Sequence, residues 1–224
     1  MLTNSPADLD RIRRLDAQAV RDSVSLVRQV TSDDLLRPTP CSAWTLTDLL
    51  AHMTAQHRGF AAAALGYGQD LAHWEVRPLP EGVAGEYGEA AEQVIAAFAS
   101  VATCERPFVL PELSGGRFPA ARAIGFHFLD YVVHSWDVAR SLGVAYEPDA
   151  ELQAAALAIA RAVPDGGFRL TRDSPFRPAL PADDGASTWE QILRLLGRSP
   201  GWRDPSREAA ADRHQASTVP DTTC

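Results

Sequence analysis

The stretch FLDYVVHSWDVARSLG, from Phe128 to Gly143, is predicted to be the later part of a long core helix. The helical pattern runs over residues 120–142, and Gly143 is a usual helix stop. Asp130, His134 and Asp137 fall on one side of this helix, among valines and a tryptophan that favour burial. A core helix with two carboxylates and an imidazole needs a chemical explanation, because unpaired buried charges are costly.

The rest of the chain is predicted to be helical as well, and no convincing run of alternating strands appears. Further helices are expected over residues 6–30, 45–65, 89–101, 149–163 and 187–196, and a loop over 105–119. The pattern indicates an all-α fold, a four-helix bundle with additional C-terminal helices. Residues 1–202 are expected to form a single domain, and the polar residues 203–224 a disordered tail.

Composition narrows the class of protein. The chain has 224 residues and a formal net charge of -8, which is unfavourable for sequence-independent nucleic-acid binding. It contains no apolar run long enough for a bilayer and no signal-peptide apolar block at its start. Its three cysteines, Cys41, Cys104 and Cys224, are few and widely spaced, which fits a reducing compartment. We expect a cytoplasmic protein without nucleic-acid or membrane partners.

The polar stripe is compatible with a metal site. Residues four apart lie one above the other on a helix, so Asp130 and His134 project side by side and can share one metal ion. The predicted second helix offers His52 on its apolar side. Two simpler interpretations stay open: an inward histidine that only fills the core, and a surface pair worth about 0.3–0.5 kcal/mol. His127 lies on the same stripe as a competing ligand, whereas His57 is expected to be exposed.

Three patches of the sequence resemble a known family. PTPCSAWTLTDLLAHM, from Pro38 to Met53, is similar to a signature of the DinB-like (YfiT-like) metal-binding superfamily. More narrowly, this patch, DYVVHSWDVARSLG and STWEQILRLLGRSPGW resemble the actinobacterial mycothiol-dependent maleylpyruvate isomerase group. The likeness covers most of residues 8–202. It is more specific for the family than for any one reaction.

The resemblance implies a four-helix bundle that binds a divalent metal through one histidine and a carboxylate–histidine pair. These ligands correspond to His52, Asp130 and His134, with Asp130 where the isomerases commonly have Glu. Zn²⁺ is the expected metal, with Ni²⁺ and Fe²⁺ as alternatives. Asp137 corresponds to the family's Asp and would orient a ligand or act on substrate. The characterised isomerase also receives an arginine from a C-terminal α/β domain, for which this sequence shows no evident counterpart.

The expected activity is that of a metal-dependent enzyme acting on a small electrophilic substrate. A low-molecular-weight thiol, with mycothiol as the candidate co-substrate, would be activated by the metal. The thiol either leaves after isomerisation or stays attached in an S-transfer. One alternative is a thiol-independent hydrolase or cyclase on the same bundle. The other is a non-catalytic metal-binding protein in which His127 or Cys41 is the fourth metal ligand and leaves no open coordination position.

Three further residues are weaker candidates for substrate binding. Arg140 could meet a substrate carboxylate or pair with Asp137 on the surface. Trp44 and Trp136 could form the wall of a pocket or simply fill the core. Homodimerisation through an Ala-rich helix face is a further expectation, although no seam stands out in the sequence.

Overall fold

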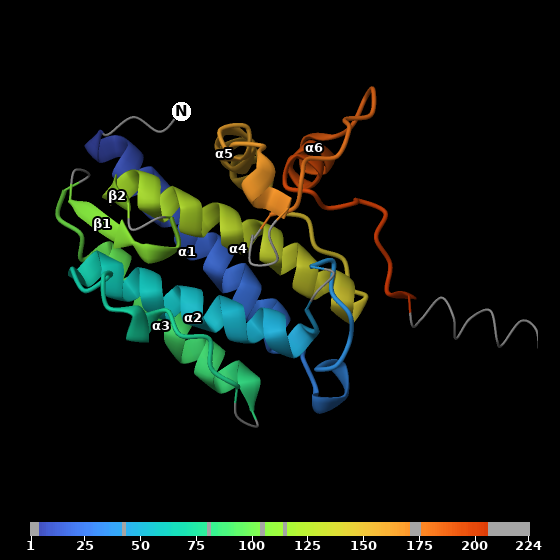
Figure 1. The fold of residues 1–224 in the computed structure, drawn as a ribbon, viewed down its shortest axis with the longest axis horizontal. Coiled ribbons are helices and arrows are strands. Elements are labelled where there is room, and N and C mark those ends of the chain that lie inside the picture. Colours follow the sequence, from blue (N-terminus) through green and yellow to red (C-terminus); the bar gives the residue numbers. More distant parts are fainter. Residues whose placement is uncertain are drawn as a thin grey trace, which may run out of the picture.

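A computed structural model describes residues 5–41, 44–79, 82–103, 106–113, 116–170 and 176–205. Within these ranges the chain is mostly helical, so the predicted all-α class is confirmed (Figure 1). The α-helices are α1 (Pro6–Val27), α2 (Leu46–Leu65), α3 (Val83–Ala99), α4 (Ala120–Leu142), α5 (Ala150–Ala160) and α6 (Thr188–Leu195). Short 3₁₀ turns are η1 (Ser32–Asp34), η2 (Leu71–His73), η3 (Pro111–Leu113) and η4 (Gly167–Leu170).

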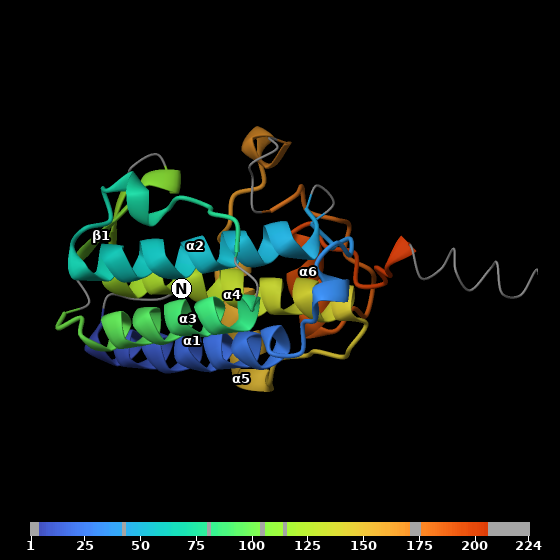
Figure 2. The ribbon, with the colours of Figure 1, turned by 90° about the horizontal axis from the view of Figure 1, so that it is seen from below.

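Helices α1 to α4 form the bundle. Helices α1 and α4 run in one direction, and α2 and α3 run in the opposite one (Figure 2). Each helix packs on two neighbours, α1 on α4 and α3, and α2 on α3 and α4. The interior is apolar with a few paired polar groups, such as the 2.7 Å hydrogen bond from the Tyr87 hydroxyl to Ser23 Oγ. Helix α5 packs on α4, and α6 packs on α5.

Local sequence signals explain where the central helices begin and end. At the start of α2, the Thr45 hydroxyl caps the Asp48 amide while the Asp48 carboxylate accepts from the Thr45 amide. Gly66 and Gly143 close α2 and α4 in the left-handed region, with φ of 97° and 74°. Both helices match the predicted ranges closely. Helix α3 begins six residues before its predicted start at Glu89, after Gly82.

The predicted loop over residues 105–119 was wrong in one respect, because it contains a β-hairpin. Strands β1 (Pro107–Leu110) and β2 (Gly116–Pro119) pair antiparallel, with Phe108 opposite Phe118. Phe108 is fully buried and packs against Phe98 of α3, at 6.0 Å between ring centroids. Four residues per strand give too little alternation to be recognised in the sequence.

Two segments complete the described structure. The connection from α2 to α3 follows the bundle back to its other end, since these helices run in the same direction (Figure 2). Beyond α5, Arg169 donates to four backbone carbonyls, those of Val163, Pro164, Arg177 and Leu195.

No helix in the described ranges is both long and apolar enough to cross a membrane. The expected disordered tail lies outside the described residues from position 206 onward.

The close packing of the α2–α3 connection against Gly59 of α2 gives a stability prediction. A Cβ on Gly59 would overlap the indole ring of Trp74. We expect Gly59→Ala to lower the free energy of unfolding by about 1–3 kcal/mol, because the buried indole would have to move. Urea denaturation measures this change. Gly85→Ala in α3 is the matched control: its added Cβ meets nothing within 4 Å, and we expect no loss of stability. Equal losses in both variants would contradict the packing argument.

Candidate metal centre

The structure brings His52, Asp130 and His134 together between α2 and α4. One ligand atom from each lies within 4.8 Å of the other two. The imidazole rings of His52 and His134 meet edge to face, with centroids 5.5 Å apart. Asp130 and His134 are one helical turn apart on α4, and His52 faces them from the second turn of α2. The three residues predicted from sequence therefore converge on one point.

The free face of His134 is directed toward this point. Its Nδ1 contacts Asp137 Oδ2 at 2.9 Å, which places a proton on Nδ1 and directs Nε2 toward Asp130. His134 Nε2 lies 3.3 Å from Asp130 Oδ1 as an ion pair, yet this fully buried atom has no hydrogen-bond partner among the described residues. An unsatisfied buried nitrogen is costly for a folded protein, and a cation would satisfy it.

Protonation differs between the two imidazoles. Burial lowers the pKa of His52 to about 4, so this ring is neutral near pH 7 and able to bind a metal. Burial also opposes the charge on His134, but the Asp130 and Asp137 carboxylates outweigh it and raise its pKa well above the usual value. A metal ion at this point would take the place of the His134 proton.

Asp137 is the anchor of a second group of side chains. Its buried carboxylate accepts from Arg198 Nη2 at 2.9 Å and from Cys41 Sγ at 3.2 Å, in addition to His134. Burial opposes ionisation of Asp137, but the Arg198 charge and the His134 hydrogen bond prevail and lower its pKa to about 2. Cys41, His134 and Asp137 form a second group with metal-ligand spacing. In this group, however, the Arg198 guanidinium already supplies positive charge.

Two contributors to this region are absent from the sequence prediction. Arg198 lies 61 residues from Asp137 in the chain, and no helical spacing connects them. Glu112 of η3 accepts a 2.8 Å hydrogen bond from Gln56, which lies one turn beyond His52 on α2. Partial desolvation of its carboxyl group raises the pKa of Glu112, the Gln56 hydrogen bond opposes this shift, and the nearby Asp130 charge adds to it. The i, i+4 spacing of His52 and Gln56 is the sequence signal that could have placed Gln56 beside the predicted ligand His52 on α2.

The weaker candidates lie in different places. The Trp44 indole packs against His52, with ring centroids 4.7 Å apart, and lies 6.4 Å from the ring of His134. Trp136 is buried, and the Arg140 guanidinium lies 5.2 Å from its ring centroid. Arg140 also donates to the Pro200 carbonyl at 3.1 Å. Trp44 therefore borders the cluster, whereas Arg140 connects α4 to the C-terminal segment and lies over the Trp136 ring.

His127 and His57 belong to a separate buried chain. His127 Nδ1 contacts Asp16 Oδ1 at 2.7 Å, and His127 Nε2 contacts His57 Nδ1 at 3.2 Å. His57 is fully buried and stacks on Tyr131 at 4.0 Å, so the prediction that it is exposed was wrong. Both edges of the His127 ring are thus occupied, which separates it from the candidate metal ligands.

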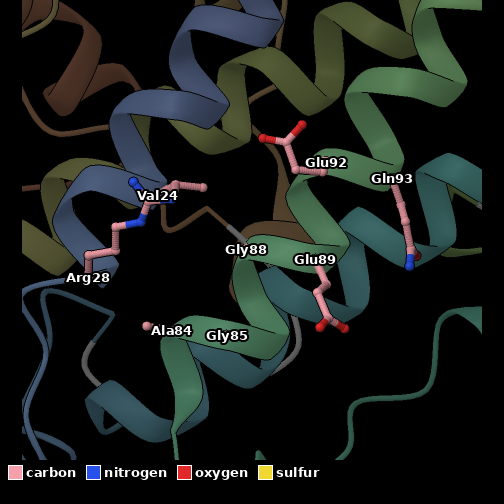
Figure 3. A pocket seen from close by; sticks show the side chains of 8 residues that line it. All are labelled: Val24, Arg28, Ala84, Gly85, Gly88, Glu89, Glu92 and Gln93. Atoms are coloured by element: carbon pink, nitrogen blue, oxygen red, sulfur yellow. The ribbon is translucent and has the colours of Figure 1, made fainter.

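An open groove lies elsewhere, between α1 and α3. It has a volume of about 660 Å³. Figure 3 shows Val24 and Arg28 at the end of α1 on one side of this groove, and Gly85 and Gly88 of α3 on the other. Since the cluster of His52, Asp130 and His134 lies between α2 and α4, this groove is on the other side of the bundle. None of the predicted site residues lines it.

These features define a helical-bundle protein with a candidate metal centre built from two facing helices. Comparison with known sequences places it more narrowly. Residues 17–139, more than half of the chain, match the mycothiol maleylpyruvate isomerase N-terminal domain. The chain belongs to this family, which confirms the resemblance found in the sequence. The matched range contains His52, Asp130, His134 and Asp137, and it ends before Arg198.

Individual proteins also resemble the chain in sequence or in fold. An uncharacterised protein of Mycobacterium tuberculosis, Rv0738 in strain H37Rv and MT0763 in strain CDC 1551, is 29% identical over 180 residues. This match covers 78% of the chain and 91% of the relative. Among solved structures, the mycothiol-dependent maleylpyruvate isomerase superposes with a TM-score of 0.58 at 14% identity, covering 86% and 90% of the two chains. A mutant of that isomerase gives 0.53 at 11% identity, covering 68% and 69%. At such low identity, the likeness establishes the fold.

The buried Asp137–Arg198 pair gives a stability prediction. Asp137→Asn removes the charge that compensates a buried guanidinium, so we expect the free energy of unfolding to fall by about 3 kcal/mol. Asp165→Asn is the matched control, because Asp165 is half exposed and lies 3.5 Å from Arg169; we expect a change below about 1 kcal/mol. Chemical denaturation of both variants measures the difference. Similar losses of unfolding free energy in Asp137→Asn and Asp165→Asn would refute the claim that the buried ion pair makes the Asp137 change more destabilising.

The Asp16–His127–His57 chain predicts how stability depends on pH. Burial, then the neighbouring His127, lowers the pKa of His57 well below 6.5. The unfolded chain therefore binds a proton near pH 6.5 that the folded chain does not, and stability falls as the pH drops below that value. The contribution of one such group approaches about 1.4 kcal/mol per pH unit.

The measurement is the free energy of unfolding between about pH 6.5 and about pH 4.5. We expect the free energy of unfolding to depend less steeply on pH in His57→Gln than in the wild type. Some pH dependence should remain, because the variant still contains the buried His52. His73→Gln, at an exposed position, should keep the wild-type slope. An unchanged slope in His57→Gln would show that His57 takes up its proton in the folded state.

Proposed function

We propose that this protein is a metal-dependent, thiol-dependent isomerase. In this proposal His52, Asp130 and His134 hold a divalent cation, and mycothiol serves as the thiol co-substrate for a small electrophilic substrate. One observation carries the proposal: three potential ligand atoms, one each from His52, Asp130 and His134, lie within 4.8 Å of one another between α2 and α4. Membership of the isomerase N-terminal-domain family supports the thiol and the reaction class.

The residues present fit a zinc-like ion. Two imidazole nitrogens and one carboxylate oxygen are common ligands of Zn²⁺ in catalytic sites, where protein ligands leave a position for water or substrate. His52 is held in the neutral form that metal binding needs. Ni²⁺ and Fe²⁺ also accept imidazole and carboxylate ligands, and they remain alternatives for the resident ion.

When bound, the cation would lower the pKa of a thiol that reaches it. Side chains of this protein would orient the ligands, shield them from water and bind the substrate or thiol. Asp137 fixes the ring orientation of His134, and Trp44 shields the imidazole of His52. Gln56 and Glu112 supply amide and carboxyl groups at the edge of the cluster, where they can bind hydroxyl or amine groups of a substrate or thiol.

The non-catalytic alternative requires a closed site with a fourth protein ligand. The candidates for that position are His127 and Cys41. His127 is bound to Asp16 and His57, and Cys41 Sγ contacts Asp137 and Arg198. Because both have other partners, an open coordination position is favoured. S-transfer and thiol-independent hydrolysis or cyclisation use the same open position, and only turnover measurements distinguish them from isomerisation.

The metal proposal predicts the stoichiometry of ion binding. We expect purified protein to retain about one divalent ion per chain, and His52→Ala and His134→Ala to lose most of it, because each removes one of three protein ligands. Elemental analysis by mass spectrometry measures the ion content. His73→Ala, an exposed histidine away from the cluster, should retain it. Full metal retention in both ligand variants would refute the assigned site.

The thiol proposal needs a separate measurement. Conversion of maleylpyruvate by zinc-loaded protein should require mycothiol and should be lost in His134→Ala. Covalent addition of thiol to the substrate, detected by mass spectrometry, would indicate an S-transferase instead. Turnover without any thiol would indicate a thiol-independent metalloenzyme.

A further inference from the structure

Arg198 reaches the candidate metal centre from outside the four-helix bundle. It follows α6, yet only 3% of its surface is exposed. Its Nη2 contacts Asp137 Oδ2 at 2.9 Å and Cys41 Sγ at 3.1 Å, and its Nη1 donates to the Leu196 carbonyl at 2.9 Å. The ring of Phe176 lies 5.5 Å from the guanidinium carbon. The C-terminal segment thus places a full positive charge beside α4.

The end of α6 is built to direct this side chain inward. Gly197 adopts a left-handed conformation with φ of 75°, and the Arg198 amide bonds back to the Leu193 carbonyl at 2.8 Å. A Cβ on Gly197 would lie 2.6 Å from the carbonyl oxygen of Arg177, so only glycine fits at this position. Arg169 holds the same turn through the Leu195 carbonyl at 2.6 Å.

Arg198 acts on the candidate site through the Asp137 carboxylate, whose Oδ1 accepts from Arg198 Nε at 3.5 Å. Asp137 Oδ2 receives Arg198 Nη2 and His134 Nδ1, both at 2.9 Å. The guanidinium fixes the carboxylate, and the carboxylate fixes the tautomer and ring orientation of His134. The opposite ring nitrogen, Nε2, then points toward Asp130 and His52. Partners of this kind affect metal affinity without binding the metal.

We propose that Arg198 is a positioning residue of the metal centre, acting through Asp137 on His134. The segment after α6 would therefore set the cation affinity of the bundle although it supplies no ligand. This inference rests on the proposed metal site. A direct role in binding substrate is less compatible with the geometry, because the guanidinium is buried and committed to Asp137 and Cys41.

The test is the Zn²⁺ affinity of the full chain, measured by competition with a chromophoric chelator. We expect Arg198→Met to bind Zn²⁺ about 10–100-fold more weakly than the wild type. Arg198→Lys should recover part of the loss, since an ammonium can reach Asp137 but lacks the planar fork that also meets Cys41. Arg194→Met is the matched control, because Arg194 lies on α6 and pairs with Asp183 at the surface.

A second measurement distinguishes positioning from general destabilisation. The visible absorption spectrum of the Co²⁺-loaded protein reports ligand geometry, and we expect it to change in Arg198→Met and not in Arg194→Met. A lower unfolding midpoint in Arg198→Met with wild-type Zn²⁺ affinity and Co²⁺ spectrum would overturn the proposal. Should that variant not fold, Arg198→Gln, which keeps a hydrogen-bond donor without the charge, is judged by the same two outcomes.

The two proposals fail in different ways. If the wild type binds neither Zn²⁺ nor Co²⁺, the metal-dependent function is refuted, and the role of Arg198 with it. If the wild type binds both ions and Arg198→Met matches it in affinity and spectrum, only the positioning role is refuted.

Discussion

The structure depends on a carboxylate that has no access to water. A buried charge is stable only when its partners are close and well oriented, and removing one of them leaves the other uncompensated. Asp137 meets this requirement with groups from three parts of the chain, namely Cys41 in the loop before α2, His134 on α4 and Arg198 after α6. The loop, the bundle and the C-terminal segment are therefore joined electrostatically at the point where the candidate metal ligands meet.

Much of the fold could be predicted because helix signals are local. A capping box specifies the start of α2, glycines close both α2 and α4, and helical periodicity places Asp130 beside His134. The features that escaped prediction depend on distant contacts. The hairpin strands are too short to show alternation. Arg198 joins the site because α5 packs on α4 and α6 packs on α5, which brings the end of α6 to Asp137.

The histidines show where helical spacing stops being informative. His57 follows His52 by five residues, which turns it about 140° around α2 and away from the metal cluster. That rotation was expected to expose it. Helix α2 is covered on two sides, however, so the rotated ring meets Tyr87 of α3 and His127 of α4. Asp16, on a third helix, then determines that His127 joins His57 rather than the ligand cluster.

The two ring nitrogens of His134 face surroundings of different charge. Nε2 faces His52 and Asp130, while Nδ1 faces Asp137, Cys41 and a guanidinium. The second half has donor atoms spaced as a metal site would have them, but Arg198 lies within 3.1 Å of two of them. A divalent ion there would be repelled by a charge that cannot be deprotonated. A metal centre at His134, as proposed, would therefore hold a single ion, on the Nε2 side of the ring.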